Sequence, residues 1–429
     1  MNFVSERAPL RVRHFVTELT GGTGVASLRL HSALARHGIE SRLHHRFGSS
    51  NATHVTIDHR HRSRLWRLWQ GYVISRRWRQ QNPERGIFIH SRWIYRSGLR
   101  DFGPMPDVVN LHLLFRWLDL PSFLSSIPEG LPVVWSLHDL HAATGGCIHP
   151  IDCEHFTTHC HHCPNLKKPR NRDCSWHEFN LKDRLYRRLN LHIVGNSEWT
   201  TTQARRSALM RHAKSFQTIP PGLDTEAFTS VEKSCARQAL GVATKKFVVG
   251  FSCADFSDPN KGAALLLELL RDLARQTEIT LLAFGSGKLP ATEGKFEVVQ
   301  FGTIQSPRMQ SIFYSACDTF VVPSRIESFG LTALEAMACS TPVVAFRTGG
   351  LSQLVVHEKT GLLADLATGA PSLFEALSWM IHHPGERQNM GSAARLRVER
   401  EFSASLLAQR YAELYQSLIA GNHSGDGRP

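Results

Sequence analysis

The chain has 429 residues, of which 42% are hydrophobic and 20% are charged, so its composition is that of a globular protein and excludes a disordered or fibrous one. This length is enough for two domains that each bury a core of their own. The 50 Lys and Arg residues against 37 Asp and Glu residues give a net charge of +13, which favours anionic partners such as nucleotides, nucleic acid or an acidic membrane surface.

The N-terminal residues lack the apolar core of a secretion signal, and no later apolar run reaches the roughly 20 residues of a membrane-spanning helix. We therefore expect a cytoplasmic protein. In a reducing compartment, the nine cysteines are expected to be free thiols or metal ligands and not disulfides.

In the first half of the chain, strand-like apolar runs alternate with helical patterns. Residues 10–17 are typical of a strand, residues 21–24 form a glycine-rich turn, and residues 25–37 have the apolar spacing of a helix. Further strands are predicted at residues 107–111, 132–137 and 191–195. This alternation is typical of βαβ units around a parallel sheet.

The second half repeats the alternation. Helices at residues 263–274 and 309–316 lie between predicted strands, and a Pro- and Gly-rich segment at residues 219–224 is typical of a connection between domains. The strands are predicted at residues 246–251, 279–284, 297–301, 319–322 and 342–346.

These patterns predict an α/β protein with two doubly wound, Rossmann-like domains. We expect the first domain at residues 1–218, with a Cys- and His-rich loop at residues 141–175, and the second at residues 219–402. A C-terminal helix at residues 403–420 and a polar, glycine-rich tail at residues 421–429, expected to be disordered, complete the chain.

Two carboxylates follow the predicted strand at residues 319–322. Glu327 lies on a glycine-bearing turn, and Glu335 lies on the helix that this turn opens. Ligands of α/β proteins bind beyond the carboxyl ends of the strands, so both side chains and the helix N–H groups can converge on a ligand with hydroxyl and phosphate groups. The alternative is that Glu335 caps or solvates a helix and Glu327 is a loop charge.

Several motifs, in the same order along the chain, resemble those of family 4 retaining glycosyltransferases, which have the GT-B fold. They are the turn at residues 21–24, the connection at residues 219–224 followed by Phe228, Lys261 before Gly262, and Glu327 with Glu335. The resemblance runs from about residue 12 to about residue 415. It is nearest to the exopolysaccharide branch, which includes colanic-acid-type enzymes, because His138 and Asp139 are followed by residues 144–147 and a cysteine cluster. It implies that the two domains face a central cleft.

By this resemblance, the second domain binds the nucleotide-sugar donor. Glu335 would accept hydrogen bonds from the ribose hydroxyls, Glu327 would hold a hydroxyl of the donor sugar near the reacting carbon, and Lys261 would place its ammonium on the diphosphate. The backbone of the following residues would also face the donor: Phe329, Gly330, Leu331, Thr332, Gly349 and Gly350. A solvated surface lysine is the alternative for Lys261.

The sequence departs from the family pattern in two places. No Arg stands a few residues before Lys261, so either Lys261 works with backbone amides alone or Arg325 shares the anionic load. Arg325 could equally pair with Glu327. Ser352 and Gln353 stand where the family often has Pro and Glu.

On the first domain, the resemblance assigns His138 to the reaction, where it would contact the donor sugar or shuttle a proton. Gly21, Gly22, Gly24 and His112 would face the acceptor or a phosphate. The alternatives are a histidine bonded to backbone at the edge of the core and a simple tight turn. The implied mechanism is front-side attack by the acceptor hydroxyl, with the leaving phosphate taking the proton, so no covalent nucleophile and no cofactor for catalysis are expected.

Cys147, Cys153, Cys160 and Cys163 lie in a His-rich segment. Four thiolates that end in a Cys-x-x-Cys pair are enough for a tetrahedral structural zinc site, although the outer spacing is not that of a common zinc finger. Free thiols that pack a long loop are the alternative. A metal here would brace a loop beside the cleft and take no part in catalysis.

Residues 60–100 contain eleven arginines and one acidic residue, Glu84, interleaved with tryptophans. Residues 64–79 have the pattern of a basic amphipathic helix, which suits an anionic lipid surface. An ordinary helix with its apolar side in the core is the alternative.

We therefore expect a retaining transferase that moves a sugar from a UDP- or GDP-sugar to a glycan or a polyprenyl-diphosphate-linked acceptor in exopolysaccharide biosynthesis, at the inner face of the cytoplasmic membrane. Two alternatives stay open. A nucleotide-sugar epimerase or a silent sugar-binding scaffold would share the fold. A zinc-containing nucleic-acid-binding protein would use the positive charge and the cysteines, but it leaves Glu327 and Glu335 without a role, so nucleic acid is not expected as a partner.

Overall fold

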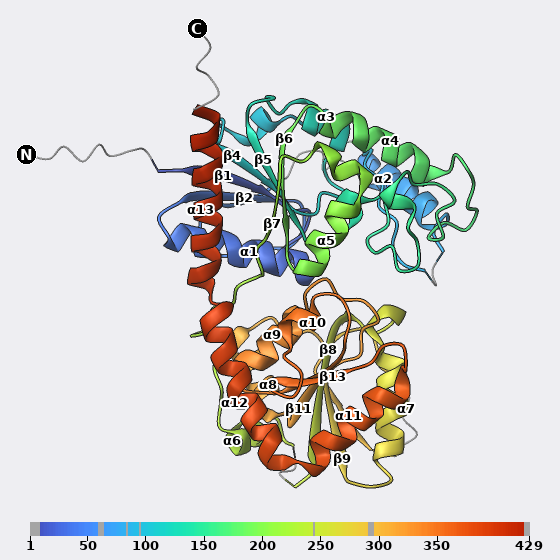
Figure 1. Ribbon diagram of the computed structural model, residues 1–429, viewed down its shortest axis with the longest axis vertical. Helices are drawn as coiled ribbons and strands as arrows, with labels where there is room; N and C mark the ends of the chain where they lie inside the picture. Colours follow the sequence, from blue (N-terminus) through green and yellow to red (C-terminus); the bar gives the residue numbers. More distant parts are fainter. Residues whose placement is uncertain are drawn as a thin grey trace, which may run out of the picture. The chain divides into compact units, whose positions relative to one another are not determined.

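The computed structural model describes residues 9–58, 64–82, 85–93, 96–242, 245–290 and 296–423. The chain divides into two compact units (Figure 1), and each is built on its own parallel sheet. Unit 1 comprises Met1–Pro220 together with Leu407–Pro429, and unit 2 comprises Pro221–Leu406. The final helix, which the sequence analysis treated as a separate segment, thus belongs largely with unit 1.

The sheet of unit 1 has seven parallel strands in the order β3-β2-β1-β4-β5-β6-β7. The strands are β1 (Arg11–Phe15), β2 (Glu40–His45), β3 (Val55–Ile57), β4 (Val108–Leu111), β5 (Pro132–Leu137), β6 (Asn190–Gly195) and β7 (Ser215–Thr218). The predicted strands correspond to β1, β4, β5 and β6. The strands β2 and β7 were missed because each carries only one apolar residue, and β3 because it has only 3 residues.

Helices cover both faces of this sheet. Val12, Val108 and Val134 pack against α1 (Gly21–Arg36) and α13 (Ala404–His423), while the residues that follow in two of these strands, such as Val109 and Trp135, face the opposite side. The helices on that side are α3 (Leu120–Ser125), α4 (Cys174–Tyr186) and α5 (Glu198–Arg206). This alternation of buried residues follows from the two-residue period of a strand.

The helix α13 is bound to the sheet by hydrogen bonds as well as apolar contacts. Asn110 donates to Oη of Tyr415 over 2.8 Å, and the hydroxyls of Ser136 and Tyr411 lie 2.8 Å apart. Residues 421–423, expected to be disordered, are instead the last residues of α13, which ends at His423. The rest of the expected tail, residues 424–429, lies outside the described residues.

The sheet of unit 2 has six parallel strands in the order β10-β9-β8-β11-β12-β13. The strands are β8 (Phe247–Asp255), β9 (Ile279–Ser286), β10 (Glu297–Gln300), β11 (Thr319–Val322), β12 (Val343–Phe346) and β13 (Gly361–Ala364). The helices are α6 (Lys233–Ala239), α7 (Ala263–Leu273), α8 (Pro307–Ala316), α9 (Leu331–Ala338), α10 (Leu351–Leu354), α11 (Ala370–His382) and α12 (Pro384–Glu401). One face of the sheet packs against α8, α9 and α12, and the other against α7 and α11.

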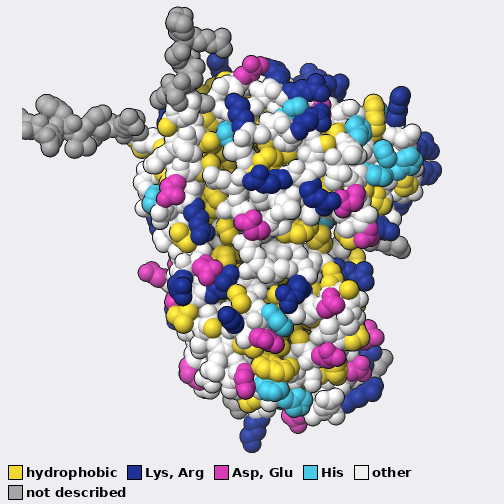
Figure 2. All heavy atoms as spheres, in the orientation of Figure 1, with side chains coloured by type: hydrophobic (Ala, Val, Ile, Leu, Met, Phe, Trp, Pro, Cys, Tyr) yellow, Lys and Arg dark blue, Asp and Glu magenta, His cyan; other side chains and the backbone are white. Residues whose placement is uncertain are grey.

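Both sheets are doubly wound, which confirms the predicted α/β class with two Rossmann-like domains. The strand order reverses between β1 and β4 in unit 1 and between β8 and β11 in unit 2. On the face drawn in Figure 2, Lys and Arg side chains are interspersed with Asp and Glu side chains. Among the described residues, no helix has both the length and the apolar character needed to cross a membrane.

Candidate functional site

The point where the strand order of unit 2 reverses brings Lys261 and Glu327 together. Lys261 follows β8 and Glu327 follows β11, and these two strands are neighbours. The Nζ atom of Lys261 lies 2.8 Å from Oε2 of Glu327, and the two side chains are 29% and 20% exposed. Ligands of open α/β sheets bind at such a reversal. The structure therefore joins two of the predicted site residues into one accessible ion pair.

This ion pair fixes the charge of Lys261. Burial acts to lower the pKa of its ammonium group, but the Glu327 carboxylate outweighs this effect and holds that pKa above its ordinary value. Arg325 is exposed and forms no ion pair with Glu327, although both residues are described in full. Lys261 is therefore the cation that this turn presents to an anionic ligand.

A close approach of two turns positions the ion pair. Gly262, between Lys261 and α7, has φ +73°, and a Cβ atom there would lie 2.4 Å from the carbonyl oxygen of Pro323. The backbone N–H of Arg325 donates to the carbonyl of Asn260 over 2.9 Å. Only glycine lets the turn after β8 pack this tightly against the turn after β11.

The predicted glycine pair Gly349 and Gly350 supports Glu327 from behind. A Cβ atom at Gly349 would lie 1.9 Å from the carbonyl oxygen of Glu327, and the N–H of Gly350 donates to that same oxygen over 2.9 Å. These two glycines therefore fix the backbone of a site residue. Their predicted contact with the donor stays a prediction.

The residues at the start of α9 offer mainly backbone N–H groups, and fewer side chains, to a ligand. The ring of Phe329 is 2% exposed and packs in the core of unit 2, so only its backbone can face a ligand. Gly330 has φ +102° and immediately precedes the first helical residue. Leu331 and Thr332 are partly exposed in the first turn, where backbone N–H groups have no partner within the helix.

Glu335, in α9, is almost fully buried. It is 5% exposed, and its Oε2 atom accepts a hydrogen bond from the hydroxyl of Tyr314 over 2.8 Å. A carboxylate has two oxygens and several acceptor positions, so the bond to Tyr314 orients the group without using all of them. The predicted contact with ribose hydroxyls stays a prediction.

The corresponding reversal in unit 1 carries histidines. His112 follows β4 and His138 follows β5, and Nδ1 of His112 lies 2.9 Å from Nε2 of His138. His14, in β1, continues this contact on the other side of His112, with 3.2 Å between the ring nitrogens. Burial lowers the pKa of His138 to about 4. His112 is 2% exposed, so it lies beneath His138 and does not itself reach the surface where an acceptor would bind.

The glycine-rich turn of unit 1 lies at the same reversal, and its residues form the start of α1, which begins at Gly21 and not at the predicted residue 25. Gly21 and Gly22 are exposed in its first turn. Gly24 is buried, and a Cβ atom there would lie 2.4 Å from the carbonyl carbon of Leu19. The turn thus leaves helix N–H groups uncovered, an arrangement that suits an anion.

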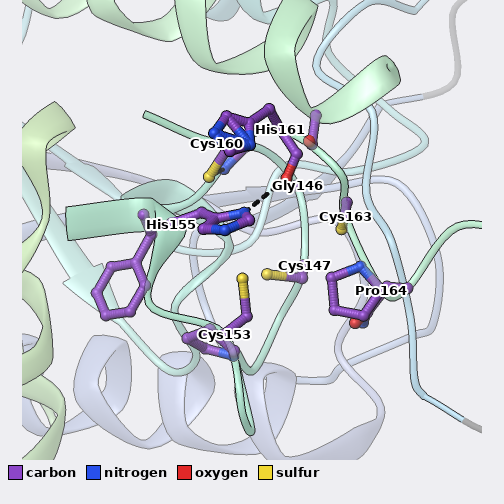
Figure 3. A pocket seen from close by; sticks show the side chains of 13 residues that line it. Gly146, Cys147, Cys153, His155, Cys160, His161, Cys163 and Pro164 are labelled. Atoms are coloured by element: carbon purple, nitrogen blue, oxygen red, sulfur yellow. Dashed lines mark hydrogen bonds between the residues drawn. The ribbon is translucent and has the colours of Figure 1, made fainter. Parts of the chain in front are cut away.

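The four cysteines of the predicted metal site border one pocket, together with His155 (Figure 3). The backbone N–H of Gly145 donates to Sγ of Cys160 over 3.1 Å. A hydrogen bond with Cys163 lowers the pKa of Cys147, and burial raises the pKa of Cys160 to about 12. Within the described part of the chain, no three or more metal-binding side chains already stand in a ligand arrangement. The zinc prediction is therefore not confirmed.

A buried lysine that the sequence analysis missed holds this loop against α4. Lys182 is 1% exposed, and its Nζ atom donates to the carbonyls of His141, over 2.5 Å, and Thr144, over 3.0 Å. Burial lowers the pKa of Lys182. His14 and Tyr314 were also missed. No pattern marks them, because each becomes a partner of a site residue only when strands or helices distant in sequence come together.

The sequence of unit 2 is similar to that of known proteins. Residues 235–397, which make up most of unit 2, match the family model "Glycosyl transferases group 1". Unit 2 is therefore similar to group 1 glycosyltransferases over most of its length. A D-inositol 3-phosphate glycosyltransferase of Pseudarthrobacter chlorophenolicus is 37% identical over 193 residues, which cover 42% of this chain and 45% of the relative. The chain thus spans about half the length of the curated relatives that it matches.

Two further similarities extend the comparison. A GDP-mannose-dependent monoacylated alpha-(1-6)-phosphatidylinositol monomannoside mannosyltransferase of Corynebacterium glutamicum is 30% identical over 234 residues, 51% of this chain and 60% of the relative. The crystal structure of Anabaena HepE in complex with UDP and glucose superposes with a TM-score of 0.61 at 19% identity and covers 95% of this chain and 100% of that one. This likeness shows that the chain has the GT-B fold, in which there are two Rossmann-like domains.

Proposed function

We propose that this protein is a retaining glycosyltransferase of family 4 that takes its sugar from a nucleotide-diphosphate donor. The ion pair of Lys261 and Glu327 carries the proposal, because it sets a cation and a carboxylate at the ligand position of a group 1 glycosyltransferase domain. When the bond from the sugar to the diphosphate breaks, negative charge grows on the departing phosphate. Lys261 stabilises that charge, and Glu327 is free to hold a hydroxyl of the sugar.

The first steps of catalysis follow from this arrangement. Donor phosphates draw the Lys261 ammonium partly away from Glu327, and the first-turn N–H groups of α9 add partial positive charge. The acceptor hydroxyl attacks from the side that the leaving phosphate occupies, and the phosphate takes its proton. Much of the rate then comes from holding the donor sugar and the acceptor hydroxyl in the right geometry. Neither a covalent protein intermediate nor a cofactor is required.

A donor-binding measurement tests this proposal. We expect Glu335→Gln to raise the dissociation constant of UDP or GDP about tenfold in a calorimetric titration, because a charged hydrogen bond to ribose is replaced by a neutral one. The matched control is Glu297→Gln, at the other end of the sheet. Nucleotide binding that is unchanged in a folded Glu335→Gln protein contradicts the assignment.

An activity measurement separates the remaining alternatives. The protein is incubated with UDP- and GDP-sugars, with and without glycan and polyprenyl-diphosphate-linked acceptors. Free nucleotide released only with an acceptor indicates a transferase. A changed sugar indicates an epimerase, and binding without either product indicates a scaffold.

For the acceptor, we propose a glycan or lipid-linked saccharide used in exopolysaccharide synthesis at the inner face of the cytoplasmic membrane. The two relatives described above are named for inositol 3-phosphate and for a phosphatidylinositol monomannoside, which supports an anionic or lipid-linked acceptor. The exopolysaccharide role rests on the sequence motifs alone. The helix α2 (Arg64–Trp78) exposes Leu68, Trp69 and Tyr72, beside the exposed Arg76. Exposed aromatic and basic side chains on one helix suit an anionic lipid surface.

Vesicle sedimentation tests the membrane contact. We expect the protein to sediment with vesicles that contain anionic lipid, and less so after the double change Leu68→Ser and Trp69→Ser. A matched change at exposed apolar positions of unit 2, Leu366→Ser with Leu396→Ser, serves as the control. Equal sedimentation of both variants contradicts a role for α2.

We also propose that Cys147, Cys153, Cys160 and Cys163 bind one structural zinc ion after small side-chain rotations. The shared pocket, the set of four thiols and the N–H donor to Cys160 support this proposal. Elemental analysis is expected to find one zinc per chain, lost in Cys147→Ser and kept in Cys253→Ser. Absence of zinc from the protein purified and refolded with zinc overturns it.

A further inference from the structure

Three histidines of unit 1 form a continuous row across three neighbouring strands. We call His14, His112 and His138 the histidine row. Nδ1 of His14 lies 3.2 Å from Nε2 of His112, and Nδ1 of His112 lies 2.9 Å from Nε2 of His138. The first two rings stack with their centres 5.5 Å apart, and the second pair lies 5.2 Å apart. His14 is fully buried, His112 is 2% exposed, and His138 is partly exposed.

The row has only two self-consistent proton arrangements when its members are neutral. Burial lowers the pKa of all three rings, so they are neutral at pH 7. A neutral imidazole has one N–H and one acceptor nitrogen, and each contact in the row needs one of each. Therefore all three rings must carry the hydrogen on the same kind of nitrogen, either Nδ1 throughout or Nε2 throughout.

The buried end of the row decides between the two arrangements. Nε2 of His14 is buried and has no hydrogen-bond partner among the described residues. The nearby ring of His31 does not provide one, because its own nitrogens bond to Ser41 and to the carbonyl of Thr53. An orphaned N–H group is rare in protein interiors. Nε2 of His14 is thus the bare acceptor nitrogen, and the hydrogen lies on Nδ1 in every ring.

We propose that the histidine row is one tautomeric unit that holds His138 as an Nδ1–H hydrogen-bond donor for an oxygen of the substrate, with His14 and His112 as positioning residues. Nδ1 of His138 makes no hydrogen bond to any residue that the structure describes, so it is available to a ligand. Oδ1 of the neighbouring Asp139 contacts the backbone N–H and the ring of His141, and no hydrogen bond joins Asp139 to His138 among the described residues. That the oxygen belongs to a sugar or phosphate rests on the proposed function.

The hydrogen positions in the row do not allow His138 to shuttle a proton. If His138 gave up its Nδ1 proton, its Nε2 would have to take one from His112, and His112 would take one from His14. His14 would then need a new proton at Nε2, where the described residues provide no source. The row therefore suits a donor that keeps its proton, which agrees with a mechanism in which the leaving phosphate accepts the proton of the acceptor hydroxyl.

Long-range proton–nitrogen correlation spectra of histidine-labelled full-length protein test the proposal without any assay of activity. At pH 7 we expect His138 to show a protonated Nδ1 and a bare Nε2. In His14→Phe, which keeps a ring but removes the first donor, His112 loses its fixed tautomer and His138 shifts toward a mixture. His14→Asn supplies an amide N–H at the position of Nδ1 and is expected to restore the wild-type spectrum.

The matched control is His192→Phe, because His192 is buried in the same sheet but bonds to Ser215 and Asn190 outside the row. It should leave the His138 signals unchanged. A protonated Nε2 on His138 in the wild-type protein overturns the proposal, and so does an unaltered His138 spectrum in folded His14→Phe or, if that variant does not fold, in His112→Phe.

If the protein is a transferase, His14→Phe should also lower its turnover about tenfold with little change in donor KM, and His14→Asn should recover it. Wild-type protein without transferase activity but with the expected spectra would count against the proposed function and support the row. Active protein in which His14→Phe changes neither spectra nor turnover would do the reverse.

Discussion

The two units use the same sheet plan but place opposite kinds of chemistry where the strand order reverses. In unit 2, a charged pair of Lys261 and Glu327 lies partly exposed on turns that glycines lock together. In unit 1, the reversal is lined by the buried imidazoles of His14 and His112, by the partly exposed one of His138 and by a helix start with open glycines. A fixed cation suits an anionic donor, whereas a neutral N–H donor suits a hydroxyl or an oxygen that must be oriented without being ionised.

The largest expected effect comes from removing the Lys261 cation of unit 2. Lys261→Met should lower kcat/KM about a hundredfold or more, because a group that stabilises charge in the transition state is lost. Lys246→Met is the control, since Lys246 pairs with Glu297 over 3.1 Å at the opposite end of β8. Steady-state kinetics with the best donor measure the effect. A similar loss in both variants would mean that Lys261 acts only through stability.

The glycine turns should differ in how they tolerate a methyl group. Gly349→Ala is expected to lower the free energy of unfolding by about 3 kcal/mol, because Gly349 has φ +49° and the new Cβ meets the Glu327 carbonyl. Gly21→Ala should cost only about 1 kcal/mol, since Gly21 has φ +71° but nothing within 4 Å of its Cβ position. Urea denaturation measures both. An equal loss of unfolding free energy in the two variants would contradict the difference between the tightly packed turn at Gly349 and the open turn at Gly21.

The smallest expected effect is a pH dependence of stability that comes from unit 1. Burial places the pKa of His14 and His112 well below the ordinary value of 6.5, and that of His138 at about 4. The unfolded chain then binds more protons than the folded one below pH 6.5, so stability falls as the pH drops from 6.5 toward 4. His112→Phe should show a shallower fall in the urea midpoint between pH 6.5 and 5, and the exposed His177→Phe should keep the wild-type slope. Parallel slopes in all three proteins would mean that these histidines bind protons equally in the folded and the unfolded chain.

The sequence was sufficient wherever a residue's role follows from its neighbours in the chain. Apolar runs located the central strands β4, β5, β8 and β11, because strands buried on both faces are apolar throughout. The apolar run at residues 319–322 and the glycine turn after it predicted a strand, a turn and a helix in that order, as observed. The edge strands β3 and β7 were missed since half-exposed strands leave a weak apolar signal.

Pairing between distant residues could not be predicted in this way. Lys261 and Glu327 were both singled out, but as contacts of a ligand and not of each other. The bond of Tyr314 to Glu335 depends on how α8 packs against α9, and Lys182 reaches the loop at residues 141–144 only because α4 packs beside it.

By itself, the sequence determined that this protein has two doubly wound domains and where the glycine turns, carboxylates and cysteines stand along them, because periodicity and turn chemistry are local properties. Only the tertiary structure decided that Lys261 meets Glu327 and that three histidines share their hydrogens in one row. A parallel sheet brings the ends of β1, β4 and β5 within hydrogen-bond distance, although more than twenty residues separate each histidine from the next.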